Sequence, residues 1–273
     1  MRCLAFLTGL LACLALSSTD RAFAQSSDYT TLTSPQSAQN WHLTLGAGLR
    51  YQPDYEGSND YMFRARPIIS LGRGVKSTWW SAEDDAISIG FFSGQAWRVG
   101  FSGDILWKRN ASTNVALIGM PEPKFGVEAG GFVEFYPTSW LRGRVDLRRG
   151  FVTHDALVAD VKLEAFTRIG AWSLGAGPRM RIAGADYVRT YFGTYGGWPG
   201  TGGLLQRFNA GVYSVGAIAQ ATYNWTDKFQ TTAYVEYKHL VGDAAKSPIV
   251  KTYGSRDSIT LGISASYAFD LGF

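Results

Sequence analysis

Residues 258–273, the last sixteen of the chain, read S-I-T-L-G-I-S-A-S-Y-A-F-D-L-G-F. From Ile259 to Phe273 every odd position is apolar, whereas the even positions carry small or polar residues. Side chains of a strand point alternately to its two faces, so this segment predicts one long strand with one apolar face. Strands of soluble proteins are usually about 5–6 residues long. The length, the alternation and the aromatic end therefore favour a transmembrane β-barrel over a soluble β-protein.

The same period of two recurs upstream, and short connections alternate with long ones. This arrangement is typical of an outer-membrane barrel, where short periplasmic turns alternate with longer outer loops. We predict an all-β, transmembrane, antiparallel up-and-down β-barrel of about twelve strands over residues 40–273. The least regular pair, 75–81 and 86–92, flanks the acidic loop Glu83–Asp85. The predicted strands are 40–52, 61–71, 75–81, 86–92, 96–107, 124–136, 141–148, 157–165, 172–182, 207–224, 228–240 and 258–273.

Composition supports this fold class. The chain has 9 Trp and 14 Tyr, which suit interfacial aromatic girdles. Its mean hydropathy of −0.06 excludes a protein with many membrane-spanning helices, whereas a barrel hides its apolarity in alternation. A net charge of +4 is too mild to indicate a nucleic-acid partner.

The N-terminus has the features of an export signal. Arg2 is followed by an apolar stretch from Leu4 to Leu16, and Ala22-Phe23-Ala24 forms a cleavage motif. We predict a signal peptide over 1–24 and a polar periplasmic lead-in over 25–39, and we expect the protein in the Gram-negative outer membrane, surrounded by its lipid. A lipobox ending at Cys13 is the alternative. Both cysteines precede residue 25, so the predicted mature chain contains no thiol.

The inward positions of the predicted strands are rich in charge. Eleven are basic and six are acidic, an excess of about five positive charges. A buried charge must be paired or hydrated, so the lumen is either an ion-paired plug or a small, mildly anion-preferring pore. The basic cluster singled out as a candidate site is Arg64, Arg66, Arg142, Arg144, Arg148, Arg179 and Arg181. The other inward charges are Arg50, Arg98, Lys162, Arg168, Asp104, Glu128, Glu134, Asp146, Asp160 and Glu164.

No residue pattern indicates catalysis. His42, His154 and His239 lie far apart and lack metal-ligand spacing, and no G-x-S-x-G motif occurs. We therefore assign no catalytic, cofactor-binding or metal-binding residue and predict a protein that is not an enzyme. Glu83–Asp85 could bind a divalent ion at the cell surface, although a solvated loop is the simpler interpretation.

Four further segments stand out: G-A-G-L-R-Y-Q-P-D-Y-E-G-S at 46–58, A-D-Y-V-R-T-Y-F-G at 185–193, L-V-G-D-A-A-K-S-P-I-V at 240–250 and Y-A-F-D-L-G-F at 267–273. In this order they resemble the MltA-interacting protein (MipA/OmpV) family of Gram-negative outer membranes. Residues 75–95 depart most from the family pattern. The candidate residues in these segments are Pro53, Tyr55, Gly57 and Ser58 in the first loop, Ser247 and Pro248 in the last loop, and Tyr267, Phe269 and Phe273 as a terminal assembly signal.

The resemblance implies an outer-membrane protein without catalytic activity. One family member is described as an adaptor that holds a lytic transglycosylase near a peptidoglycan synthase, and others are associated with adhesion, osmotic response or drug uptake. Three hypotheses follow: a membrane anchor or scaffold for peptidoglycan (murein) maintenance proteins, a small-solute channel, and a surface adhesin acting through the outer loops.

Overall fold

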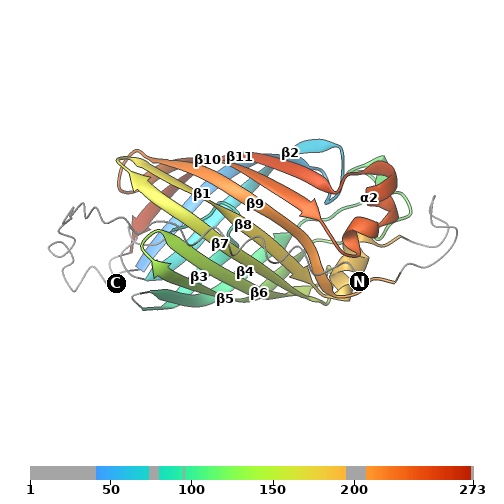
Figure 1. Ribbon diagram of the computed structural model, residues 1–273, viewed down its shortest axis with the longest axis horizontal. Helices are drawn as coiled ribbons and strands as arrows, with labels where there is room; N and C mark the ends of the chain where they lie inside the picture. Colours follow the sequence, from blue (N-terminus) through green and yellow to red (C-terminus); the bar gives the residue numbers. More distant parts are fainter. Residues whose placement is uncertain (1–40, 74–79, 95, 195–206, 272–273) are drawn as a thin grey trace, which may run out of the picture. The chain divides into compact units, whose positions relative to one another are not determined.

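Eleven strands close into one barrel in the described part of the computed structural model, which comprises residues 41–73, 80–94, 96–194 and 207–271 (Figure 1). The barrel closes where β1 pairs antiparallel with β11, from His42 opposite Asp270 to Tyr51 opposite Leu261. The strands are β1 (Trp41–Pro53), β2 (Tyr61–Arg73), β3 (Ile87–Ser93), β4 (Trp97–Leu106), β5 (Gly126–Thr138), β6 (Leu141–Phe151), β7 (Leu157–Ile169), β8 (Trp172–Ala183), β9 (Gly211–Asn224), β10 (Phe229–Leu240) and β11 (Asp257–Asp270).

The β2–β3 junction differs from the prediction. These strands pair in parallel, with Ser70 opposite Ser88 and Leu71 opposite Ile89, whereas the other neighbouring strands are antiparallel. The strand predicted over 75–81 is wrong at Trp80 and Ser81, which are not in a strand; residues 74–79 lie outside the described part. Two consecutive strands can pair in parallel only if the connection between them runs back along the barrel. Residues 80–86, which precede β3, lie in the lumen, and we call them the inward segment.

The outer surface of the barrel is apolar, as the alternation predicts. On β11, Leu261 and Ile263 are exposed, whereas the alternating Gly262 and Ser264 are buried. Aromatic side chains are exposed near both ends of the strands, which matches the interfacial girdles of membrane barrels. Those near the short connections include Trp97, Trp140, Trp172, Trp225, Tyr267 and Phe269, and those near the long loops include Tyr51, Phe63, Trp107, Phe125 and Tyr237.

The two ends of the barrel are built differently. One end carries the start of β1, the last residues of β11 and the short connections, such as Ser139–Trp140 and Gly170–Ala171. The other carries the long loops, which contain α1 (Ala185–Phe192), α2 (Pro248–Tyr253) and the 3-10 turns Val115–Leu117 and Ala244–Lys246. None of the described helices is long and apolar enough to cross a membrane.

Most of the hydrophobic core lies at the long-loop end. It contains aromatic and aliphatic side chains from the strand ends and from both helices, and we call it the cap. Its members are Tyr55, Leu117, Met120, Ala156, Val158, Ala183, Tyr187, Val188, Phe192, Tyr213, Leu240, Ala244, Ala245, Ile249 and Val250. The middle of the barrel is filled by polar and charged side chains.

Candidate functional site: a lumen filled by ion pairs

Strand β6 supplies the centre of the lumen network. Its even-numbered residues face inward and are buried, whereas Val145 and Leu147 face outward. This follows from the strand period, which puts Arg142, Arg144 and Arg148 on one face.

Arg142 is the most enclosed of these side chains, with 0% of its surface exposed. Its guanidinium donates to Glu134 on β5 at 2.8 Å, to Glu164 on β7 at 2.7 Å and to Asp85 of the inward segment at 2.7 Å. The planar fork of arginine suits several carboxylates at once. Arg142 therefore links β5 and β7 of the barrel wall to the inward segment.

Arg144 extends this centre along β6. It forms a bidentate pair with Asp146, both distances being 2.7 Å, and reaches Glu134 at 2.6 Å. Its guanidinium also lies over the ring of Phe132, 4.2 Å from the centroid. Bidentate and cation–π contacts fix the guanidinium plane, so the side chain is held rigidly.

A second group of ion pairs lies nearer the long-loop end. Arg148 pairs with Glu128 at 3.0 Å and with Asp160 at 2.5 Å, and Asp160 also accepts from Arg181 at 2.7 Å. Nε2 of His154 lies 3.1 Å from Glu128. In this group the side-chain charges alternate in sign from β5 to β8, so the charges of neighbouring strands compensate one another.

The inward segment brings acidic side chains into this basic interior. Asp84 binds Arg179 through two contacts of 2.7 and 3.0 Å, and Lys162 lies 3.3 Å from Asp84 and 3.0 Å from Asp85. Trp80 stacks on Phe166 of β7 at a centroid distance of 5.0 Å. The expectation that Glu83–Asp85 forms a surface loop is therefore wrong, because buried cations hold it inside the barrel.

The segment is also attached to the opposite wall. The side chain of Gln220 on β9 accepts from the Glu83 backbone at 2.9 Å and donates to the Ser81 carbonyl at 3.0 Å. Glu83 accepts from Ser264 on β11 at 2.8 Å. The inward segment thus spans the lumen from β6–β8 to β9–β11.

These contacts change the charge count of the lumen. The structure adds the carboxylates of Glu56, Glu83, Asp84, Asp85 and Glu236 and the ammonium of Lys238 to the charges predicted there. Arg168 is exposed beside the Gly170 turn and does not belong to the lumen. The predicted excess of about five positive charges is therefore wrong, because with these changes the basic and acidic charges are about equal in number.

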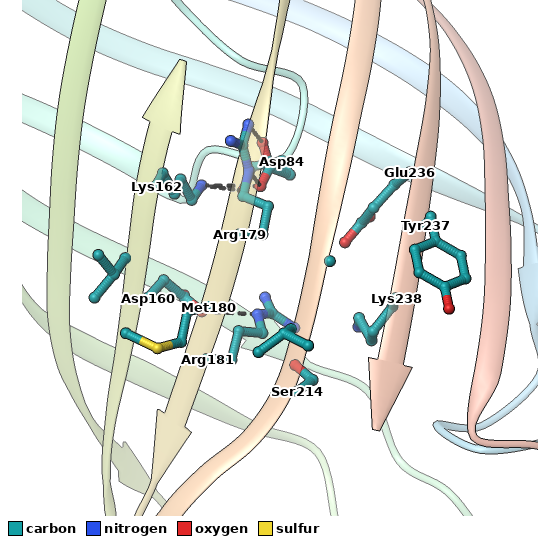
Figure 2. Close-up of a pocket in the computed structure, with 13 residues that line it drawn as sticks. Asp84, Asp160, Lys162, Arg179, Met180, Arg181, Ser214, Glu236, Tyr237 and Lys238 are labelled. Atoms are coloured by element: carbon teal, nitrogen blue, oxygen red, sulfur yellow. Dashed lines mark hydrogen bonds and ion pairs between the residues drawn. The ribbon is translucent and has the colours of Figure 1, made fainter. Parts of the chain in front are cut away.

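A small cavity of about 10 Å³ lies beside Asp84, Lys162 and Arg179, with Arg181 and Lys238 toward the long-loop end (Figure 2). This volume suits about one water molecule. Figure 2 shows that the side chains around this cavity come from the inward segment and from β7, β8, β9 and β10.

The loops that carry the family-like segments meet at the cap. The Gly57 carbonyl accepts from the Ser255 backbone at 3.0 Å, and Ser58 bridges to Gly254. The Ser247 hydroxyl donates to the Phe192 carbonyl at 2.6 Å, which fixes the start of α2 at Pro248 against the end of α1.

The first loop also reaches into the lumen through Glu56. Its carboxylate pairs with Lys238 at 3.0 Å and accepts from Tyr187 of α1 at 3.3 Å. Burial opposes ionisation of Glu56, but Lys238 and Arg181 lower its pKa below the ordinary value. The carboxylate therefore stays charged and joins the cap to the lumen network.

The remaining candidate residues lie near this network or at the rims. Arg64 donates to the Asp54 carbonyl at 2.9 Å, and Arg66 donates to the Asp85 carbonyl. Pro53 ends β1 and Tyr55 is buried in the cap. The rings of Tyr267 and Phe269 face outward, 4.8 Å apart, and Phe273 lies outside the described residues.

The described histidines each pair with one carboxylate. His42 contacts Asp270 at 2.8 Å and His239 contacts Asp257 at 2.7 Å, while His154 contacts Glu128. No group of three or more potential metal-binding side chains occurs among the described residues.

A closed barrel with an apolar girdled exterior and a charged interior is an outer-membrane β-barrel protein, and its location is the outer membrane. The chain belongs to the family described as MltA-interacting protein MipA, whose model matches residues 45–269. No curated protein matches the sequence.

Solved outer-membrane barrels are similar in fold at low identity. A bacterial polysaccharide outer membrane secretin is 9% identical, with 86% of this chain and 99% of that chain covered and a TM-score of 0.40. The outer membrane channel DcaP of Acinetobacter baumannii is 9% identical, with 84% and 96% covered and a TM-score of 0.33. OmpT of Vibrio cholerae is 10% identical, with 87% and 99% covered and a TM-score of 0.34.

Proposed function

We propose that this protein is a non-enzymatic outer-membrane anchor that holds peptidoglycan-maintenance proteins at the periplasmic end of a closed barrel. The observation that carries the proposal is the filled lumen. Arg142, Arg144 and Arg148 form buried ion pairs across it, and the inward segment occupies its centre. Such an interior suits a rigid anchor better than a solute pathway.

The proposed partners follow from the family. Its description names an interaction with MltA, which supports a lytic transglycosylase as a partner of this chain and, with it, a peptidoglycan synthase. Such enzymes act on the periplasmic side. In membrane barrels the short connections face the periplasm, so the docking surface we propose includes the turns at 139–140, 170–171 and 225–228.

The non-enzymatic part of the proposal is supported by the histidine contacts. Each described histidine is paired with a carboxylate at a different place in the barrel. A Ser–His hydrolase requires a nucleophile within hydrogen-bond reach of such a base. The side-chain partners of the described histidines are Asp270, Glu128 and Asp257, and none of them is a Ser or Thr hydroxyl.

Site-specific photo-crosslinking in cells tests the proposal. A photoreactive residue at Asp227, exposed in the β9–β10 turn, is expected to capture a lytic transglycosylase. The matched control is Lys251, which is exposed on α2 at the opposite end. Capture of a surface partner from Lys251, with no capture from Asp227, would favour the adhesin hypothesis. An absence of murein enzymes from the products at both positions would contradict the anchor proposal.

A further inference from the structure

Three cations from adjacent strands converge on two consecutive carboxylates of the inward segment. Arg142 on β6, Lys162 on β7 and Arg179 on β8 are all buried, and we call them the lumen cation cluster. We propose that this cluster is a binding site for small dicarboxylate anions, and that Asp84 and Asp85 occupy it as an internal substitute ligand.

The geometry of the cluster fits two carboxylates at once. Arg179 holds Asp84 through both of its carboxylate oxygens, at 2.7 and 3.0 Å, and Arg142 holds Asp85 at 2.7 Å. Lys162 lies between them, 3.3 Å from one carboxylate and 3.0 Å from the other. The arginine forks supply directed pairs and the lysine supplies a bridging charge, so a monocarboxylate would satisfy only part of the site.

The cluster depends on the inward segment for its neutrality. Within the described residues, the Lys162 ammonium forms its hydrogen bonds and ion pairs with Asp84 and Asp85 alone. Arg142 and Arg179 also share Glu164 of the barrel wall, and Arg142 pairs with Glu134, which Arg144 holds as well. If the segment left, the wall carboxylates would not balance the cluster, and buried unpaired cations are strongly destabilising.

Release of the inward segment alone therefore costs free energy, because it leaves buried cations unpaired. Replacement of the segment by a dicarboxylate avoids this cost. A dicarboxylate that enters the cluster restores the two negative charges and the hydrogen bonds that Asp84 and Asp85 provide. The segment should consequently stay in place in chloride and be displaced by a dianion. This goes beyond the anchor proposal, because it makes the closed state conditional on a ligand.

A small cavity lies beside the cluster. The cavity in Figure 2 touches Asp84, Lys162 and Arg179 and continues toward Arg181 and Lys238, which are partly exposed. An anion entering from the long-loop end would meet these two cations before it reached Asp84. The small size of the cavity matches a site that is occupied by the protein's own side chains.

Cysteine accessibility tests the proposal. Residues 25–273 contain no cysteine, so Ala82→Cys places a single thiol on the buried inward segment of the predicted mature protein. Its reaction with a water-soluble maleimide is compared in succinate and in acetate at equal ionic strength. When the succinate concentration is ten times its dissociation constant for the form with the segment displaced, we expect the thiol to react about tenfold faster. We expect no change in acetate. Ser112→Cys, in an exposed loop, is the control and should react equally in both.

A second variant identifies the cluster as the responsible site. Lys162→Gln in the Ala82→Cys background removes the bridging charge and should abolish the succinate response. Equal rates in succinate and acetate for Ala82→Cys would overturn the proposal even if the Lys162 variant failed to fold. A succinate response that persisted in a folded Lys162→Gln protein would also overturn it. The crosslinking result at Asp227 is independent of both outcomes.

Discussion

Replacing Arg142 by glutamine should lower the free energy of unfolding by about 3–5 kcal/mol, the cost of breaking one buried ion pair. The size of this loss in the free energy of unfolding follows from the contacts of Arg142. Arg142 binds three carboxylates, all within 2.8 Å, and has no exposed surface. A neutral glutamine leaves the network with one negative charge that is no longer compensated.

The loss should not reach three times that amount, because each of the three carboxylates keeps another cation. Glu134 still contacts Arg144 at 2.6 Å, Asp85 still contacts Lys162 at 3.0 Å, and Glu164 still contacts Arg179 at 2.5 Å. One uncompensated charge is therefore spread over three paired sites.

Arg149→Gln is the matched control on the same strand. Arg149 faces outward and is 58% exposed, and its partner Asp155 is 72% exposed. An exposed pair of this kind contributes about 0–1 kcal/mol. Urea unfolding of the refolded protein in detergent micelles, followed by tryptophan fluorescence, measures both variants. Equal losses for Arg142→Gln and Arg149→Gln would refute the view that the lumen network stabilises the barrel.

Three further variants test other parts of the molecule. Leu261→Arg places a charge on the lipid face of β11 and should cost about 2–4 kcal/mol in lipid vesicles, whereas Leu261→Phe should be nearly neutral; equal unfolding midpoints would contradict the orientation of β11. Gly57 has φ +87°, and a methyl group there would lie 2.7 Å from Val250, so Gly57→Ala should cost about 1–3 kcal/mol. Gly170→Ala, at φ +59° with open space around it, should cost less by the same urea assay, and the reverse order would argue against tight packing of the first loop on α2. The pKa of Glu56 lies below its ordinary value of 4.5, so its stabilising contribution should be complete above pH 4.5 and lost as the pH falls further; the difference in urea midpoint between wild type and Glu56→Gln should shrink with acidification, and a pH-independent difference would contradict this.

The barrel could be predicted because a membrane imposes strict alternation on each strand. Leu261 and Ile263 must face lipid while Ser264 faces the lumen, and the sequence records this period directly. The parallel β2–β3 pair could not be predicted in the same way. The inward segment is held by charge pairing with Arg142 and Arg179, which leaves no periodic signal.

One signal for the inward segment was nevertheless present. The predicted lumen carried about five unpaired cations, and buried cations require partners. Glu83–Asp85 is an acidic run between two strands, so it was a candidate source of those partners. The cap was missed for a different reason: α1 and α2 are short, and their burial depends on contacts between loops far apart in the sequence, such as Ser247 with Phe192.

Planar-bilayer recording of the refolded wild-type protein in potassium chloride tests the closed lumen most directly. The ion pairs of Arg142 and the inward segment leave a cavity of only about 10 Å³ beside Asp84, so insertion of the protein should produce no stable conductance steps. Long-lived open steps of uniform size in chloride would contradict the closed barrel on which the anchor proposal rests.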